Sequence, residues 1–216
     1  MLPPQLKSER ERILRFALIQ VPSHGWTERS LRMATTEAGF EESMSRRAFP
    51  RGINDLIDTY LSRADSLMLG ELKKYCMNDM PVRDRIRSAV RVRLEQSSNQ
   101  REAIRRLIAL QCTPQHANSA ILALHRTVDK MWRAAGDKSV DFNFYTKRAL
   151  LAGVYSATTL FWLNDHSAGF SQTWQFLDRR INDVMQLQKV RSNYETRLKH
   201  LESTASKYFQ SLASLI

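Results

Sequence analysis

The chain has 216 residues, of which 43% are hydrophobic, and carries a formal net charge of +11. This length provides for one sizeable core, and the apolar content argues against an intrinsically disordered chain. Only seven Gly and six Pro argue against an all-β architecture, so we predict an all-α protein. The positive charge favours nucleic acid or an anionic membrane surface as a partner.

The sequence offers no pattern for a metal centre, a disulfide framework or secretion. Cys76 and Cys112 fit neither a metal-ligand spacing nor a disulfide pattern, so we expect them to be reduced core residues. The five histidines form no His-x-x-x-His pair beside a carboxylate. Residues 1–20 lack the apolar stretch of a secretory signal. We therefore expect a bacterial cytoplasmic protein, and a trimmed organellar protein fits the same sequence.

The first quarter of the chain predicts three short helices followed by a long one. The first helix should end near Pro22, and Thr27 can cap a second helix that stops at Gly39. A third helix is expected over residues 42–48 and a long fourth over residues 53–75. This layout is typical of the tetracycline-repressor type of helix-turn-helix protein.

The third predicted helix is a poor match for reading DNA. It opens with Glu41 and Glu42, and two carboxylates at its start would repel the duplex, although Arg46 and Arg47 could contact phosphates. We therefore interpret residues 1–52 as a scaffold. A DNA-binding transcriptional regulator of the tetracycline-repressor type remains the alternative function.

The middle of the chain predicts two further helices and holds the focus of basic charge. Residues 81–111 contain eight arginines against three acidic residues. A helix that begins at Pro81 carries Arg83, Arg87 and Arg91 on one face, which fits either a solvated stripe or a surface for anionic lipid or an acidic partner. Another helix should begin at Pro114 and stop at Gly136.

Residues 149–164 form an uncharged stretch that is too short for a membrane span, which needs roughly 20 apolar residues. We expect a buried helix, which either packs tightly or leaves an apolar cavity beside its small residues. Ser171 should begin a helix with an inward apolar face. Behind a polar link, the apolar residues from Tyr194 onward recur at helical spacing among cations, which is typical of an amphipathic helix at a lipid surface. Docking on its own domain or on a dimer mate is the alternative.

Four segments give the sequence a more specific signature. They are HGWT at 24–27, MWRAAGD at 131–137, DFNFYTKRA at 141–149 and TWQFLDRRI at 173–181. In order and spacing they resemble the lipid-binding accessory protein family of ubiquinone (coenzyme Q) biosynthesis, from about His24 to Met185. The resemblance implies a homodimer with a tetracycline-repressor-like fold that has lost gene regulation. It implies a protein that binds isoprenoid quinones or other lipids and presents them to the di-iron hydroxylase of the pathway.

The resemblance also implies roles for individual residues. A surface for the hydroxylase is carried over to Trp132, Asp137, Asn143, Phe144, Tyr145 and Arg148. Phe144 stands where relatives often have Trp, which keeps the ring but loses the indole N–H donor. Lipid-binding residues are expected on the buried helix at Leu150, Val154, Thr158, Phe161 and Trp162. Membrane-penetrating residues are expected at Leu198, Leu201, Tyr208, Phe209 and Leu212.

These expectations combine into one reading of the chain. Residues 1–52 form the helix-turn-helix-like unit, residues 53–185 the lipid-binding core, and residues 186–216 a linker with the amphipathic helix. No motif for a nucleophile, an acid–base pair or a phosphate loop is present, so we predict a non-enzyme that needs no cofactor. It should lie at the inner membrane, on the cytoplasmic face in a bacterium or the matrix face in a mitochondrion.

Overall fold

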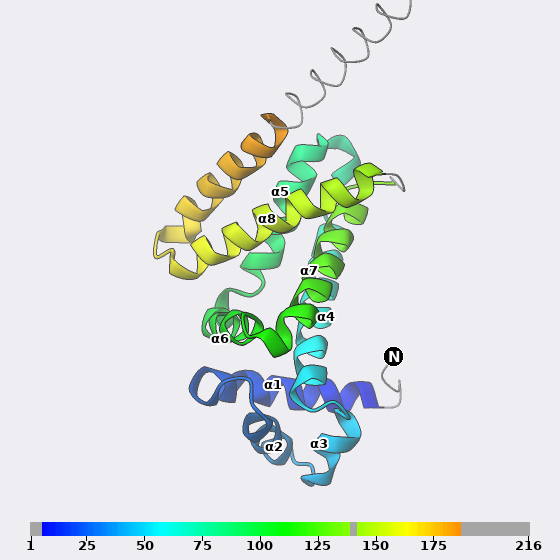
Figure 1. Ribbon diagram of the computed structural model, residues 1–216, viewed down its shortest axis with the longest axis vertical. Coiled ribbons are helices and arrows are strands. Elements are labelled where there is room, and N and C mark those ends of the chain that lie inside the picture. The colour runs from blue at the N-terminus through cyan, green and yellow to red at the C-terminus, as the bar shows by residue number, and fades with distance from the viewer. Residues whose placement is uncertain (1–5, 139–141, 187–216) are drawn as a thin grey trace, which may run out of the picture.

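The structure, a computed structural model, describes residues 6–138 and 142–186, which are helical and contain no strand. Figure 1 shows α1, α2 and α3 at one end of the molecule and a larger group of helices at the other. The long helix α4, Ile53–Leu72, connects the two groups. The prediction of an all-α fold is confirmed.

The first three helices form through local signals that the sequence contains. They span Lys7–His24, Glu28–Glu37 and Ser43–Ala48. Thr27 caps α2 by accepting a hydrogen bond from the Ser30 amide, and Gly39 takes a φ of +79° just beyond its end. Pro22 lies inside α1, which ends two residues later than predicted.

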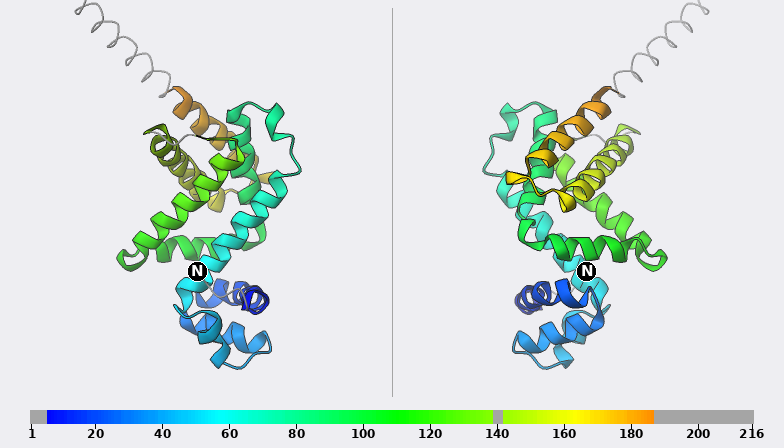
Figure 2. Two further views of the ribbon diagram at one scale, coloured as in Figure 1. Left: turned by 90° about the vertical axis from the view of Figure 1, so that its right-hand side faces the viewer. Right: turned by 90° about the vertical axis from the view of Figure 1, so that its left-hand side faces the viewer.

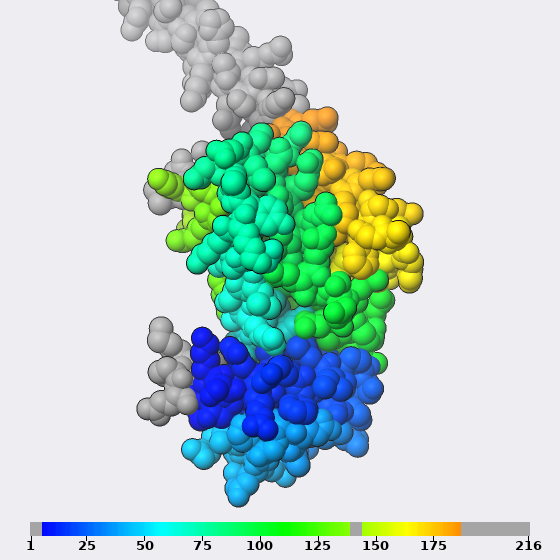
Figure 3. Space-filling view, turned by 180° about the vertical axis from the view of Figure 1, so that it is seen from behind, coloured from blue at the N-terminus to red at the C-terminus, as the bar shows by residue number. Residues whose placement is uncertain are grey.

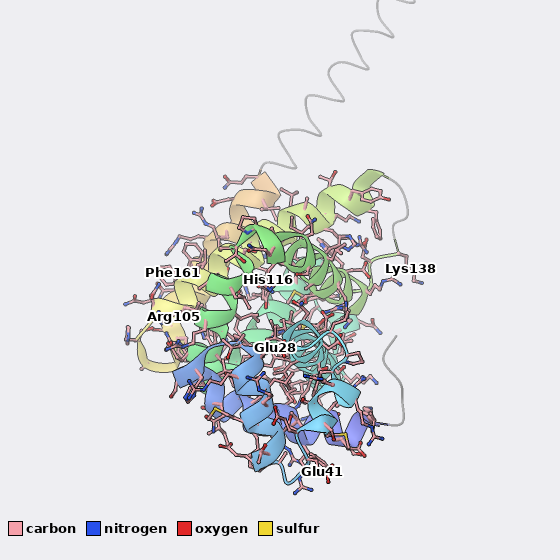
Figure 4. The ribbon with its side chains drawn as sticks, turned by 60° about the horizontal axis from the view of Figure 1, so that its bottom comes forward. Glu28, Glu41, Arg105, His116, Lys138 and Phe161 are labelled. Atoms are coloured by element: carbon pink, nitrogen blue, oxygen red, sulfur yellow. The ribbon has the colours of Figure 1, made fainter. Side chains whose placement is uncertain are left out.

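Two contacts tie this small group to the rest of the molecule. Glu28, labelled in Figure 4, accepts a hydrogen bond of 2.7 Å from the Ile53 amide and so caps α4 from α2. Trp26 is buried, stacks obliquely on Tyr60 of α4 and donates from Nε1 to the Ala103 carbonyl at 2.9 Å. Because Trp26 reaches two other helices from the turn before α2, the HGWT segment fixes the position of the whole group.

The larger group contains α5, Val82–Glu95, α6, Arg101–Gln111, α7, Pro114–Ala134, α8, Phe142–Asn164, and a helix over residues 171–186. Short 3-10 turns lie at Met77–Asp79, Ser98–Gln100 and Ala168–Phe170. Figure 2 shows α7 running beside α4, and α7 also packs on α5, α6 and α8. No helix of the described residues is long and apolar enough to cross a membrane.

A buried charge cluster joins three of these helices. Asp65 of α4 is fully buried and accepts hydrogen bonds from Arg93 of α5 at 3.4 Å and Thr127 of α7 at 3.0 Å. Its second oxygen accepts from the Lys130 ammonium at 3.0 Å. A carboxylate without water needs such partners, so this cluster fixes how α4, α5 and α7 meet.

The arginine stripe of α5 faces another helix of the same chain. Arg83 donates to Asn182, Arg87 forms an ion pair with Asp178, and the Arg91 guanidinium lies 5.1 Å from the centre of the Trp174 ring. The space-filling view shows the start of α5 directly beside the 171–186 segment (Figure 3). The stripe thus joins two helices of the chain, with Arg87 partly buried and Arg83 and Arg91 still exposed.

The expectation that the cysteines are core residues is wrong. Cys76 and Cys112 are both free and exposed. Cys112 directly follows the end of α6, and Cys76 directly precedes the short turn Met77–Asp79, so both lie in connections between helices, which run over the surface.

Candidate functional site

An apolar pocket of about 330 Å³ opens where α5 begins, α7 ends and α8 begins. This volume lies at the lower end of the range for ligand pockets, about 300–1,000 Å³. The last turns of the 171–186 helix complete its wall. The apolar side chains that line it are Val82, Ile86, Trp132, Ala135, Leu150, Leu151, Val154, Ile181, Val184 and Met185.

The mouth of the apolar pocket carries a small polar network. The Trp132 indole N–H donates to the Lys147 carbonyl at 3.0 Å, and the Lys147 ammonium lies 5.6 Å from the Trp132 ring centre. The same ammonium donates to Asp137 at 2.7 Å. Trp132, Asp137 and Lys147 all line the pocket, so the end of α7 and the start of α8 are joined at its mouth.

Arg148 lies beneath this network. It is 2% exposed, donates from Nε to Asp129 at 2.7 Å and from Nη1 to Asp137 at 3.2 Å. Burial acts to raise the pKa of Asp129, but the hydrogen bonds from Arg148 and Arg133 outweigh it and lower that pKa. Arg148 also donates to the Phe144 carbonyl at 3.1 Å, and its guanidinium stacks 3.4 Å from the centre of the Phe144 ring. It therefore supports Phe144 from inside.

Phe144 and Tyr145 form an aromatic surface at the start of α8, and neither ring lines the apolar pocket. Their rings meet edge to face, with centres 5.1 Å apart, and Tyr145 is 68% exposed. The structure thus brings together five of the six residues predicted for a partner surface, with Arg148 below that surface. Asn143 belongs to α8, and its side chain lies outside the described residues.

The residues predicted to bind lipid divide into two groups. Leu150 and Val154 line the apolar pocket. Thr158 is buried and donates to the Val154 carbonyl, while Phe161 stacks on Phe176 with ring centres 4.6 Å apart. Trp162 is fully buried against Phe170. Figure 4 shows the separation, because Phe161 lies on the opposite side of that view from Lys138, which lines the pocket.

The length of α8 explains this division. The helix begins seven residues before the predicted stretch, so its first turns pass the pocket and its last turns pack on other helices. Arg101 and Arg105 of α6 donate to the final carbonyls of α8 and hold that end in place. None of the small residues of α8, Ala149, Ala152, Gly153 and Ala157, lines the apolar pocket, and Gly153 faces open space. The pocket therefore does not lie beside the small residues, where a cavity is one of the two expectations from the sequence.

Several pocket residues could not be assigned to a pocket from the sequence. Val82 and Ile86 come from α5, and Ile181 and Val184 come from the 171–186 helix. Their helical spacing marks them as an apolar face, but spacing alone does not distinguish a face that packs tightly from one that lines a cavity. The predicted membrane residues Leu198, Leu201, Tyr208, Phe209 and Leu212 lie outside the described residues.

The described residues also bear on a metal site and on a DNA-binding site. Within residues 6–138 and 142–186 no cluster of three or more His, Cys, Asp or Glu side chains is arranged to hold a metal ion. Glu41 and Glu42 are exposed at the start of α3, where Figure 4 shows Glu41 at the far end of the molecule, and Glu42 forms an ion pair with Arg32 at 3.4 Å. These carboxylates lie where a recognition helix would meet DNA.

Comparison with known proteins places this geometry in context. The COQ9 family model matches residues 117–188, which include α8 and most of α7. The chain is 33% identical over 190 residues to the mitochondrial ubiquinone biosynthesis protein COQ9 of Rattus norvegicus and 32% identical over 190 residues to that of Homo sapiens. Both alignments cover 82% of this chain, and they cover 59% and 58% of the relatives. The chain therefore spans about three-fifths of the length of these two relatives.

A more distant relative and a solved structure extend the comparison. The COQ9 protein of Schizosaccharomyces pombe is 29% identical over 189 residues, with 88% of this chain and 75% of the relative covered. A TetR transcriptional regulator from Nitrosomonas europaea has a TM-score of 0.67 at 24% identity and covers 81% of this chain and 97% of its own. This likeness confirms the tetracycline-repressor-like fold.

Proposed function

We propose, from the premise that this chain belongs to the COQ9 family of ubiquinone biosynthesis proteins, that it binds an isoprenoid quinone or another lipid in the apolar pocket. It then presents this ligand, at the membrane surface, to the di-iron hydroxylase of the pathway. The membrane is the matrix face of the inner membrane in a mitochondrion or the cytoplasmic face in a bacterium.

The pocket supports the binding step. Ten of its sixteen lining residues are apolar, and the charged ones are Arg83, Arg85, Asp137, Lys138 and Lys147. Each methylene of a lipid tail is stabilised by about 0.8 kcal/mol on leaving water. Apolar side chains in the pocket therefore provide much of the stabilisation that the tail has in a bilayer. A pocket of this kind lowers the barrier to taking a water-insoluble ligand out of the membrane.

The observation that carries the presentation step is a shared carboxylate. Asp137 accepts from Lys147, which lines the pocket, and from Arg148, which supports Phe144. One ionic network therefore fixes both the mouth of the pocket and the aromatic surface. A partner that contacts Phe144 and Tyr145 would meet the same end of α8 that contributes Lys147 and Leu150 to the pocket.

In this proposal the chain acts by binding and not by catalysis. Two charged residues that line the pocket, Lys147 and Asp137, pair with each other, and Arg148 beneath them holds both Asp137 and Asp129. Such pairs orient side chains and do not leave a nucleophile or a general base facing the ligand. We therefore assign the chemistry to the hydroxylase.

The test fills the apolar pocket from inside. Leu150→Trp places a ring in the pocket, whereas Ala149→Trp adds the same ring at the neighbouring exposed position of the same helix. All three proteins are purified gently and are first shown to have the same unfolding temperature. Mass spectrometry should then find several-fold less bound lipid or quinone in Leu150→Trp than in the native chain. Ala149→Trp should hold the native amount. Equal lipid content in all three proteins would contradict the proposal.

A further inference from the structure

A second pocket lies on the other side of α8. It has a volume of about 280 Å³ and is enclosed by α4, α6, α7 and α8. On α8 the apolar pocket uses Leu150 and Val154, whereas the second pocket uses Tyr155, Thr159 and Leu160. The helix therefore separates two cavities, and we call this one the polar-floored pocket.

Its walls and its floor differ in chemistry. The walls are aliphatic and consist of Leu61, Leu107, Ile108, Ile121, Leu124 and Leu160. The floor contains Arg93 and Thr127, which are 3% and 4% exposed, and the more open Tyr155. A cavity with aliphatic walls and a few converging polar groups fits an amphipathic ligand.

The floor has more positive than negative charge. Arg93 and Thr127 donate to Asp65, and Lys130 donates to the same carboxylate from outside the pocket. Two cations thus share one anion. Burial raises the pKa of Tyr60, which interacts electrostatically with Arg93, to about 12, so this phenol stays neutral and does not balance the charge. Lys130 is partly exposed, whereas Arg93 is buried and meets Asp65 by one contact of 3.4 Å, so the Arg93 guanidinium is the group that an additional anion or strong acceptor would stabilise.

We propose that the polar-floored pocket is a second ligand site that takes a single-chain lipid with a carboxylate head, such as a long-chain fatty acid. The carboxylate lies at Arg93, where it balances the excess charge, and the chain lies along the aliphatic walls. Charge-assisted hydrogen bonds are about twice as strong as neutral ones, so the charged head should be preferred over a hydroxyl of the same chain length.

The two exposed cysteines provide a probe and its control. Cys112 lines the polar-floored pocket, whereas Cys76 precedes the short turn Met77–Asp79 and lines neither pocket. In the full-length Cys76→Ser chain, N-ethylmaleimide reports on Cys112 alone, and in Cys112→Ser it reports on Cys76 alone. Oleate below its critical micelle concentration should slow alkylation of Cys112 at least several-fold and leave Cys76 unaffected.

The head-group preference is tested in the same protein. Oleate should protect Cys112 at concentrations about tenfold lower than oleyl alcohol. Lys130→Gln removes the excess charge while its amide can still donate to Asp65, so in that variant the two ligands should protect equally. Leu150→Trp, which fills the apolar pocket, should leave the protection by oleate unchanged, and this separates the second site from the first.

Three outcomes would overturn the inference. They are no protection of Cys112 by oleate, equal protection of Cys112 and Cys76, and equal potency of oleate and oleyl alcohol in the chain with native Lys130. None of them depends on a substitution in the buried cluster. Loss of protection in Leu150→Trp would place the ligand in the apolar pocket and would also count against a second site.

Discussion

At the scale of single residues, the aromatic surface depends on a side chain buried beneath it. Arg148 holds Phe144 by a hydrogen bond to its carbonyl and by stacking on its ring, and Tyr145 rests against the edge of Phe144. The Tyr145 ring loses little freedom on binding because it is already in place. Such a ring is suited to be a hot spot of an interface.

Tyr145→Ala should therefore weaken binding to the hydroxylase by about 2 kcal/mol or more, with an unchanged unfolding temperature because the ring is exposed. Trp132→Ala should weaken binding and also lower stability, since Trp132 packs against the core and donates to the Lys147 carbonyl. Surface plasmon resonance and calorimetry measure the two effects. Tyr75→Ala, at an exposed ring elsewhere, is the control. Native affinity in Tyr145→Ala would remove this residue from the interface.

A second residue-scale prediction concerns Asp165, which joins α8 to the 171–186 helix. Burial acts to raise its pKa, but hydrogen bonds from Ser167 and Thr173 lower it from 3.8 to about 2. A lowered pKa in the folded state stabilises the protein above about pH 4, and this stabilisation is lost as the pH falls from 4 towards 2. A difference of nearly two pKa units corresponds to about 2 kcal/mol.

Urea unfolding of Asp165→Asn should accordingly show a loss of about 2 kcal/mol at pH 7 and a flatter dependence on pH between 4 and 2. Asp183→Asn is the matched control, because Asp183 is exposed and pairs only with Arg180 among the described residues. A parallel pH dependence in the native chain and Asp165→Asn would show that Asp165 does not carry this stabilisation.

At the scale of helices, the role of a charged face depends on the residues of other helices that it contacts. The stripe on α5 joins the 171–186 helix, and Asp65 joins α4 to α5 and α7. The stripe contacts are half-exposed, so each contributes at most about 1 kcal/mol. The cluster at Asp65 is buried, so the loss of one member leaves charges without partners.

Asp65→Ala should therefore lower the free energy of unfolding by about 3 kcal/mol or more, because Arg93 and Lys130 lose their shared carboxylate. Asp58→Ala is the control on the same helix. Its carboxylate pairs with Arg51 and Arg126 at a half-exposed site, so this substitution should cost less than about 1 kcal/mol. Similar losses for both variants would argue against the special role of the buried cluster.

At the scale of the molecule, Val184 and Met185 line the apolar pocket just before residue 187, in the last described turn of a helix that reaches the edge of the larger helical group (Figure 1). The predicted amphipathic segment follows directly in the sequence, with its apolar residues Leu198, Leu201, Tyr208, Phe209 and Leu212. Membrane contact through this segment would bring the pocket close to the lipid surface.

A chain truncated after Gln188 should remain folded but lose flotation with anionic liposomes, since it loses both the apolar face and about 1 kcal/mol for each cation near the surface. In cells the methoxylated precursor that awaits hydroxylation should accumulate. The control replaces two apolar residues of the segment by charge, with Leu198→Glu and Leu201→Glu in the full chain. Unchanged flotation of the truncated chain would show that this segment is a strut within the protein or between copies.

The sequence by itself determined most of the helices and the resemblance to COQ9 proteins, but it did not predict α6 or the first turns of α8. Thr27 capped its helix and Gly39 ended it as predicted, because capping and periodicity depend on residues a few positions apart. The motifs at 131–137 and 141–149 led to the COQ9 family for the same reason, since they lie in continuous stretches of chain.

Only the tertiary structure decided where cavities and charge pairs lie. It placed Leu150 beside a pocket and Trp162 in the core, although both belong to one apolar helix. It paired the α5 stripe with a helix about 90 positions later in the chain, and it exposed Cys76 and Cys112. The physical reason is that such contacts depend on where helices cross, and the crossing is set by the packing of all of them together.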